Sequence, residues 1–339
     1  MRGVDRRAQR PRGARGYVLV TVLAAMALLA LVAARLDARV QAARDANDRW
    51  GQWQQTEQLL TSARELVLFT IATRPLGQLG FGAGAELLRV DGRPYVLPDS
   101  VRVSVLDLRG LISVAYPEAP LMREFLRGQG VADRDIDGLL DKLADYSDLD
   151  TLRRLNGGEA AEYTAAGLPP PRDDWPLSPH EVRGVLGWHE RPALVDAAVE
   201  NMTAVRDGWV NPNTAPPAVL RALPGASDEG VAALVALREQ RHIASALELQ
   251  AVSGIVVPDD PVSFYPGAFY RVRLWRPGSP GAVEYTVMLS PAAPTRPWLI
   301  LELRQIAPST PTHAEPEATP FPMDADAAPT LARAAAGRP

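Results

Sequence analysis

The segment Asn211–Gly225, with the sequence NPNTAPPAVLRALPG, carries the most specific pattern in the chain. Its asparagines and prolines favour a turn, and the apolar residues before Pro224 favour a short helix. A second helix is expected over about 228–240, and 244–249 begins a third. Short helices joined by tight turns predict a compact helical module. Its motif residues are Asn211, Asn213, Thr214, Ala215, Leu223, Pro224 and Gly225.

One function with this layout is DNA binding. The segment is similar to the helix-hairpin-helix (SAM-like) module, which presents backbone N–H groups and basic side chains to phosphates. Residues 211–257 contain Arg221, Arg238 and Arg241 against four acids, which leaves a net charge of -1. Weak phosphate affinity is expected from that charge. We therefore expect a structural module and no nucleic-acid partner, with a membrane-anchored periplasmic DNA-binding protein as the alternative.

Strand patterns flank this helical region on both sides. Val101, Val103 and Val105 alternate with polar residues, and a turn at 107–110 followed by the apolar residues 111–114 predicts a hairpin. Residues 117–258 contain short helical patterns broken by proline and glycine, and strand patterns return at 264–275, 282–290 and 298–306. This order predicts an α+β fold with a large all-α domain inserted into it.

Acidic residues cluster upstream of the motif. Asp145, Asp148, Asp150 and Glu159 could share a calcium ion, because carboxylates suit a hard cation. The alternative is that they cap helices and accept hydrogen bonds from turn amides. The nearby run 133–138 begins like an EF-hand loop, but Ala144 stands where that loop needs glutamate. We expect a helix there, with acids in its first turn.

The N-terminal region predicts a membrane helix. Residues 17–34, YVLVTVLAAMALLALVAA, are 18 uncharged residues, and a helix of that length spans roughly 27 Å of hydrocarbon. Six arginines and one acid in residues 1–16 predict a cytoplasmic N-terminus. A plain signal anchor and a secretory signal cut after Ala34 are two interpretations. The third is a prepilin-type leader, which this junction resembles, cut between Gly16 and Tyr17.

The helix is expected to continue to Thr73. Trp53, Leu60, Ala63 and Val67 recur at helical spacing, and Pro75 ends the pattern. The lower part of such a helix would lie in lipid and the upper part on a sheet. At the other end of the chain, residues 307–339 contain seven prolines without periodicity, which predicts a disordered tail.

Composition narrows the possible functions. The 339 residues include four histidines and no cysteine. The absence of cysteine excludes disulfides, zinc-thiolate sites, iron–sulfur clusters and thiol catalysis. The formal net charge of -4 argues against nucleic-acid binding by bulk charge. No group of residues at catalytic spacing emerges, so we expect no enzyme activity and no cofactor other than calcium.

In their order, these segments resemble general secretion pathway protein K, a minor pseudopilin of the type II secretion system. The resemblance spans roughly 17–306. It is carried by the Gly16–Tyr17 junction, by D-Y-S-D-L-D at 145–150 with G-G-E at 157–159, and by N-P-N-T-A at 211–215. Thr21 stands where pilins usually have glutamate, a residue that one pseudopilin is known to lack. Tyr146 and Ala160-Ala161 depart from the family pattern.

The resemblance implies a fold and an organisation for the whole chain. A long pilin-like N-terminal helix would pack on a small antiparallel sheet, with the helical domain inserted. The expected divisions are 1–16, the leader; 17–36, the transmembrane part; 37–116, the pilin-like helix and first strands; 117–258, the inserted helical domain; 259–306, the last strands; and 307–339, the tail.

The resemblance also implies a role in assembly. The protein would sit at the tip of the pseudopilus and support protein export across the outer membrane. Expected partners are minor pseudopilins I, J and H, the major pseudopilin, the prepilin peptidase and the inner-membrane assembly platform. The chain would cross the inner membrane once, with its N-terminus in the cytoplasm and its bulk in the periplasm.

Overall fold

The computed structural model describes residues 15–115, 119–206, 210–256, 264–278, 282–306 and 318–323. The chain forms two compact units, residues 1–58 and 59–339. Helix α1 (Arg15–Thr73) has residues in both, as 59 residues of unbroken helix. It contains no proline, and Pro75 follows directly beyond its end, so the predicted helix and its boundary are confirmed.

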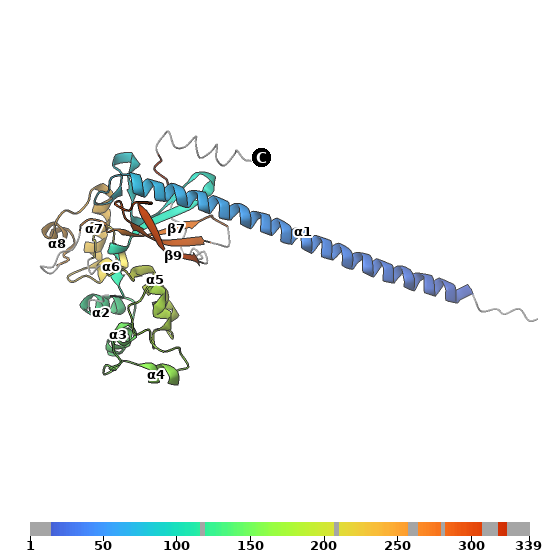
Figure 1. The fold of residues 1–339 in the computed structure, drawn as a ribbon, viewed down its shortest axis with the longest axis horizontal. Coiled ribbons are helices and arrows are strands. Elements are labelled where there is room, and N and C mark those ends of the chain that lie inside the picture. The colour runs from blue at the N-terminus through green and yellow to red at the C-terminus, as the bar shows by residue number, and fades with distance from the viewer. Residues whose placement is uncertain are drawn as a thin grey trace, which may run out of the picture. The chain divides into compact units, whose positions relative to one another are not determined.

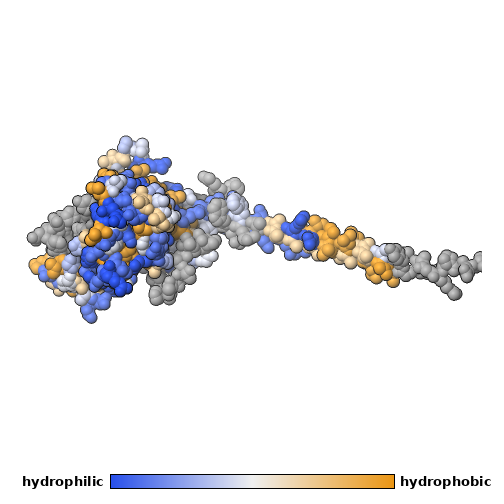
Figure 2. Space-filling view, turned by 90° about the horizontal axis from the view of Figure 1, so that it is seen from below, coloured by the Kyte–Doolittle hydropathy of each residue, from blue (hydrophilic) through white to orange (hydrophobic). Residues whose placement is uncertain are grey.

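In the first unit, the helix over Leu19–Asp45 contains an 18-residue stretch with a mean hydropathy of 2.4, and none of that stretch is buried. It is long and apolar enough to cross a membrane. Figure 2 shows hydrophobic side chains along this helix. A helix satisfies its own backbone hydrogen bonds, which is the condition for lying in lipid.

The second unit is built on a six-stranded sheet with the order β10-β3-β4-β7-β8-β9 (Figure 1). All its neighbours are antiparallel except β10 and β3, which are parallel. A separate pair, β1 (Gly80–Phe81) and β2 (Leu88–Arg89), is antiparallel. The six strands are β3 (Asp91–Val96), β4 (Arg102–Asp107), β7 (Phe269–Trp275), β8 (Ala282–Leu289), β9 (Trp298–Ile306) and β10 (Thr319–Pro320).

The last turns of α1 and one face of this sheet share a hydrophobic core. Leu60, Ala63 and Val67 are buried there, as their spacing predicts, and Val103 and Tyr270 come from the strands. Burying such side chains is the main stabilising term, at roughly 25 cal/mol for each Å² of apolar surface removed from water. The expected pilin-like arrangement of helix on sheet is confirmed.

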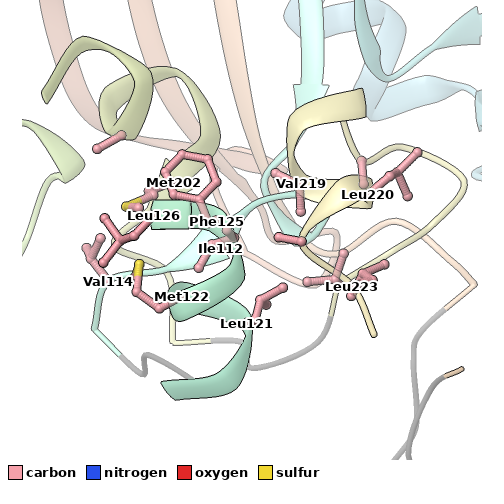
Figure 3. Packing of buried hydrophobic residues seen from close by; sticks show 14 of the residues in the cluster. Ile112, Val114, Leu121, Met122, Phe125, Leu126, Met202, Val219, Leu220 and Leu223 are labelled. Atoms are coloured by element: carbon pink, nitrogen blue, oxygen red, sulfur yellow. The ribbon is translucent and has the colours of Figure 1, made fainter. Parts of the chain in front are cut away.

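The chain between β4 and β7 forms a helical domain with its own core. Figure 3 shows α2 side chains such as Phe125 packed with Ile112, Met202 and residues of α6. Trp188 is fully buried, and its Nε1 donates to the carbonyl of Leu139 at 3.0 Å. The helices are α2 (Ala119–Gly128), α3 (Asp133–Ser147), α4 (Ala160–Ala165), η4 (Pro179–Gly184), α5 (Pro192–Asn201), α6 (Pro217–Arg221), α7 (Asp228–Gln240) and α8 (Ala246–Ser253).

The predicted hairpin over 101–114 is wrong. After β4 the chain makes a short 3-10 turn, η3 (Leu108–Gly110), and leaves the sheet. Its next strand, β5 (Ile112–Ser113), pairs in parallel with β6 (Met202–Thr203) in the helical domain. The alternating pattern correctly indicated strands, but it could not indicate their partners, because β4 pairs with β3 and β7 instead.

The interpretation of 307–339 as a disordered tail does not hold for residues 318–323. Thr319–Pro320 forms β10, and Phe321 is buried in the sheet core. One aromatic residue between prolines gives no periodic signal, which is why the sequence did not reveal this contact. The rest of that range, 307–317 and 324–339, lies outside the described residues.

The EF-hand-like run behaves as predicted, as the first turn of α3. Asp133 pairs with Arg127, and Asp137 pairs with Arg123. Ile136, Leu139 and Leu143 form the buried face of the helix. The acids here stay at the surface while the apolar residues pack.

Candidate functional site

The N-P-N-T-A motif surrounds one buried carboxylate, that of Asp107 at the end of β4. Asp107 is fully buried, and its side chain accepts hydrogen bonds from Asn211 Nδ2 (3.1 Å) and Thr214 Oγ1 (2.8 Å). It also accepts from the backbone N–H groups of Arg109 (3.1 Å) and Gly267 (3.0 Å). Burial raises the pKa of Asp107, and these four bonds oppose the rise. The motif therefore joins the helical domain to the sheet.

The second asparagine ties the motif to the loop between α7 and α8. Asn213 Nδ2 donates to the carbonyls of Ile243 and Phe264, each at 3.0 Å. Its Oδ1 accepts from the backbone N–H of Ile243 at 2.8 Å. Both asparagines and Thr214 are almost fully buried. A side chain with a donor and an acceptor is needed at 213, because it bonds to both groups of one backbone residue.

Close packing explains the small residues near the motif. Gly110 lies against Thr214, and a Cβ at Gly110 would come within 2.9 Å of the Thr214 backbone. Ala215 is fully buried, and a larger side chain in a close-packed core would have to displace its neighbours. The motif thus requires both its polar groups and the small size of its neighbours.

A buried arginine of the helical domain also takes part in the joint, the set of contacts between the motif, the helical domain and the sheet. The guanidinium of Arg238, on α7, donates to the carbonyls of Pro212 (2.9 Å) and Ala215 (2.8 Å). Burial lowers its pKa, and the charge of Asp91 on β3 opposes that shift. Arg89 Nη2 donates to the carbonyl of Arg238. These contacts link strands β2 and β3 to helix α7.

An ion-pair chain extends this link to the surface. Asp91 pairs with Arg89 and Arg93, and Arg93 pairs with Glu239 at 2.6 Å. Burial alone would raise the pKa of Asp91, but the bond from Arg93 lowers it below its usual range. Sequence reasoning missed the buried roles of Asp107, Arg89 and Arg238. Asp107 alone had a signal, since it begins the turn at 107–110.

Leu223, Pro224 and Gly225 form a hairpin that faces a second one. Gly225 and Gly254 both have positive φ, 78° and 73°, which suits glycine. A Cβ on Gly225 would come within 2.5 Å of the Gly254 carbonyl oxygen. The N–H of Val256 donates to the carbonyl of Pro224 at 2.8 Å. The hairpins face each other, whereas phosphate binding needs their backbone amides to face outward.

The arginines of residues 210–256 also have partners within the protein. Arg221 pairs with Asp228, and Arg241 pairs with Glu248. Arg238 is buried on backbone carbonyls. A phosphate would therefore have to compete with an existing bond at each of them, which disfavours the DNA-binding alternative.

The predicted calcium residues lie in one neighbourhood. Asp145 is fully buried, and Arg154 bridges it to Asp148. Asp150 accepts from the N–H of Leu152 at 2.8 Å, in a turn. Among the described residues, no group of three or more acids, histidines or cysteines is arranged to hold a metal ion. Turn and ion-pair roles thus account for most of these oxygens.

Some acidic oxygens have no such role. Asp148 Oδ1, Glu159 Oε1 and Asp173 Oδ1 are buried without a hydrogen-bond partner in the described part of the chain. The pKa of Glu159 is raised, mainly by burial. The negative charges of four aspartates add to the rise: Asp145, Asp173, Asp148 and Asp150. Gly157 packs against the carboxylate of Asp145, and a Cβ on Gly157 would lie 1.8 Å from Asp145 Oδ2. These buried oxygens are the feature that a cation would satisfy.

The predicted cleavage junction lies at the start of α1. Gly16 and Tyr17 are the second and third residues of that helix. Residues 1–14 of the expected leader lie outside the described residues. Cleavage between Gly16 and Tyr17 stays a prediction.

Comparison with known proteins favours one interpretation of the motif. Residues 210–263 match the family model of type II secretion system protein K. These residues are therefore similar to protein K. The match covers the Asn211–Gly225 motif and both hairpins, so the contacts with Asp107 and Arg238 are contacts of the protein K segment. No curated protein sequence matches the chain.

A solved structure extends the likeness to the fold. A chain in the crystal structure of the GspK–GspI–GspJ complex from the enterotoxigenic Escherichia coli type 2 secretion system is similar, with a TM-score of 0.56 and 14% identity. The match covers 77% of the present chain and 99% of that chain. The expected α+β fold and the likeness to protein K are therefore confirmed.

Proposed function

We propose that the protein is a minor pseudopilin that assembles at the tip of the type II secretion pseudopilus and supports protein export across the outer membrane. The observation that carries the proposal is the protein K segment, residues 210–263, joined by Asp107 to a pilin-like helix and sheet. Its role is assembly and not chemistry. Pseudopilins I and J are the proposed neighbours, because the similar chain lies in a complex with them. Pseudopilin H, the major pseudopilin and the assembly platform are further expected partners.

The N-terminal segment supports assembly through the membrane. Tyr17–Ala34 would hold the subunit in the inner membrane, with the bulk of the chain in the periplasm. After removal of the leader by the prepilin peptidase, this helix would pack among neighbouring helices. Small residues favour close helix packing in lipid, and the segment offers Ala24, Ala25, Ala27 and Ala30.

Two features favour the tip over a position inside the filament. The helical domain is large and would obstruct another subunit placed above it. Thr21 has no carboxylate to neutralise the N-terminal amine of a neighbour, and the first subunit has no neighbour above it. The absence of that carboxylate therefore costs nothing at the tip.

The decisive experiment measures the intact mass of the membrane-extracted protein, expressed with and without a prepilin peptidase. We expect loss of residues 1–16 only when the peptidase is present. Co-expression with tagged pseudopilins I and J is then expected to recover the processed chain in a complex. An uncut chain would indicate a plain signal anchor, and a cut near Ala34 would indicate a protein released from the membrane; either result contradicts the proposal.

We also propose that the acidic neighbourhood binds calcium. Asp145, Asp148, Asp150 and Glu159 would hold the ion, and the unpartnered oxygens of Asp148 and Glu159 support this choice. Calcium would add positive charge to a cluster in which Arg154 pairs with Asp145 and Asp148. Its role would be structural, since it would fix the 148–157 loop on α3.

The calcium proposal is tested by thermal unfolding with calcium, with magnesium and with a chelator. We expect calcium to raise the Tm, because an ion that binds only the folded state stabilises it by about 3 kcal/mol at 100 times its Kd. D148N and E159Q are expected to remove the rise. D137N is the matched control, because Asp137 is an exposed acid paired with Arg123 in the EF-hand-like run. Equal Tm values with calcium and chelator would refute the proposal.

A further inference from the structure

The C-terminal segment Ala318–Met323 lies along the outer edge of the sheet. Its strand β10 pairs in parallel with β3, with Thr319 opposite Tyr95 and Pro320 opposite Val96. The N–H of Phe321 donates to the carbonyl of Val96 at 2.8 Å. β3 would otherwise be an edge strand, and such edges can pair with other chains. The segment therefore occupies a position where strands are added.

Phe321 anchors the segment. It is 5% exposed and belongs to the core shared by α1 and the sheet. Its ring meets Tyr95 edge to face, with centroids 6.1 Å apart and planes at 82°. Tyr95 is held in place by its own hydroxyl, which accepts from the N–H of Arg89 at 2.9 Å. Met323 packs at the margin of the same core. One aromatic side chain thus supplies most of the buried contact.

Two prolines limit the pairing to a short segment. Successive residues of a strand point their backbone groups to opposite edges. Since the N–H of Phe321 faces β3, Pro320 faces away, and its missing N–H costs no bond there. Pro94 lies two residues before Val96 and shares its outer edge, where it offers no donor. A longer added strand would find no hydrogen-bond donor at that point.

We propose that the β3 edge is a binding site for a short, extended peptide segment with an aromatic residue between prolines. Its resident occupant is the chain's own Thr-Pro-Phe-Pro-Met, Thr319–Met323. The site consists of the backbone carbonyl of Val96, which accepts a hydrogen bond, and the ring of Tyr95, which contacts the aromatic side chain of the peptide. By filling this edge with its own C-terminal segment, the chain prevents strand addition by another molecule. The inference is independent of the proposed role in secretion.

The test cuts the covalent link to the segment and then asks whether the segment stays bound. A protease site with flanking glycines is inserted between Ile306 and Ala318 of the full-length, detergent-extracted protein. After cleavage, equilibrium dialysis measures how much of the fragment 318–339 stays with the protein. We expect the wild-type fragment to be retained. F321A is expected to weaken retention roughly tenfold or more, because it removes the buried ring.

T319A is the matched control, since Thr319 is exposed in the same strand, and its fragment is expected to be retained like the wild type. A second measurement adds labelled ATPFPM peptide to the cleaved and dialysed wild-type protein, with ATPAPM as its control. Binding of the first peptide and not of the second supports the site. Loss of the wild-type fragment as complete as that of F321A, or equal binding of both peptides, would overturn it.

Discussion

Two buried charges hold the joint between the sheet and the protein K segment. Asp107 accepts four hydrogen bonds, and Arg238 donates to two carbonyls. Removing one partner from such a group costs more than the bond is worth, because the remaining charge or donor is left buried and unsatisfied. The joint should therefore respond strongly to single substitutions.

We expect T214V to lower the free energy of unfolding by about 1–3 kcal/mol, because it removes the hydroxyl that donates to Asp107. T164V is the control. Thr164 is exposed on α4 and bonds only to the carbonyl one turn earlier, so its loss should cost less than about 0.5 kcal/mol. Urea unfolding of the two variants measures the difference. Equal losses would mean that the hydroxyl of Thr214 does not stabilise the joint.

The lowered pKa of Glu284 should make the stability of the folded protein depend on pH. Burial alone would raise its pKa, but nearby His180 and the charges of Arg271 and Arg273 lower it to about 2. A lowered pKa stabilises the folded state above the ordinary value near 4.5, and this stability is lost as the pH falls toward 2. We expect a loss of about 3 kcal/mol over that range. E284Q should lack this part of the pH dependence, which denaturant unfolding between pH 5 and pH 2 can measure.

At the scale of elements, α7 and α8 pack backbone against backbone. A Cβ on Gly230, in the first turn of α7, would lie 2.1 Å from the carbonyl oxygen of Ser253. Ser227 caps α7 there, its Oγ accepting from the N–H of Gly230 at 3.0 Å. The glycine is therefore required by helix packing and not by backbone conformation.

We expect G230A to destabilise the protein by about 1–3 kcal/mol, as overpacked sites do. G138A is the opposite control. Gly138 is inside α3, and a Cβ there would meet only Asn156, at 3.9 Å. Alanine favours helix over glycine by up to about 1 kcal/mol, so G138A should be neutral or stabilising. A Tm that falls in both variants would contradict the packing argument.

At the scale of the whole molecule, a substitution at Thr21 can test where the subunit lies in the filament. Under the proposed tip location, T21E should leave incorporation into the pseudopilus and secretion unchanged, because no neighbour's amine lies above it. The control is the same assay on L223D, which places a charge in the core of the protein K segment and should abolish assembly. A large gain or loss with T21E would place the subunit inside the filament.

Sequence and structure agree best where periodicity carries the information. The buried residues Leu60, Ala63 and Val67 followed from helical spacing, and the strands followed from alternation. Partners across long distances did not follow, since nothing near Asp107 in the sequence indicates Asn211 or Gly267. Phe321 was missed for a related reason. Its contact with Tyr95 depends on one side chain in a non-periodic segment, and such a contact is visible only in three dimensions.

The insertion between β4 and β7 has a consequence for the order of folding. Val103 pairs with Leu274, so the central strands of the sheet meet across more than 150 residues of chain. Contacts this distant in sequence form slowly, because a large loop must close first. If the residues after the membrane helix are exported in the order of their synthesis, the last strands reach the periplasm at the end. The helical domain has more local contacts. It should therefore acquire structure before β4 pairs with β7.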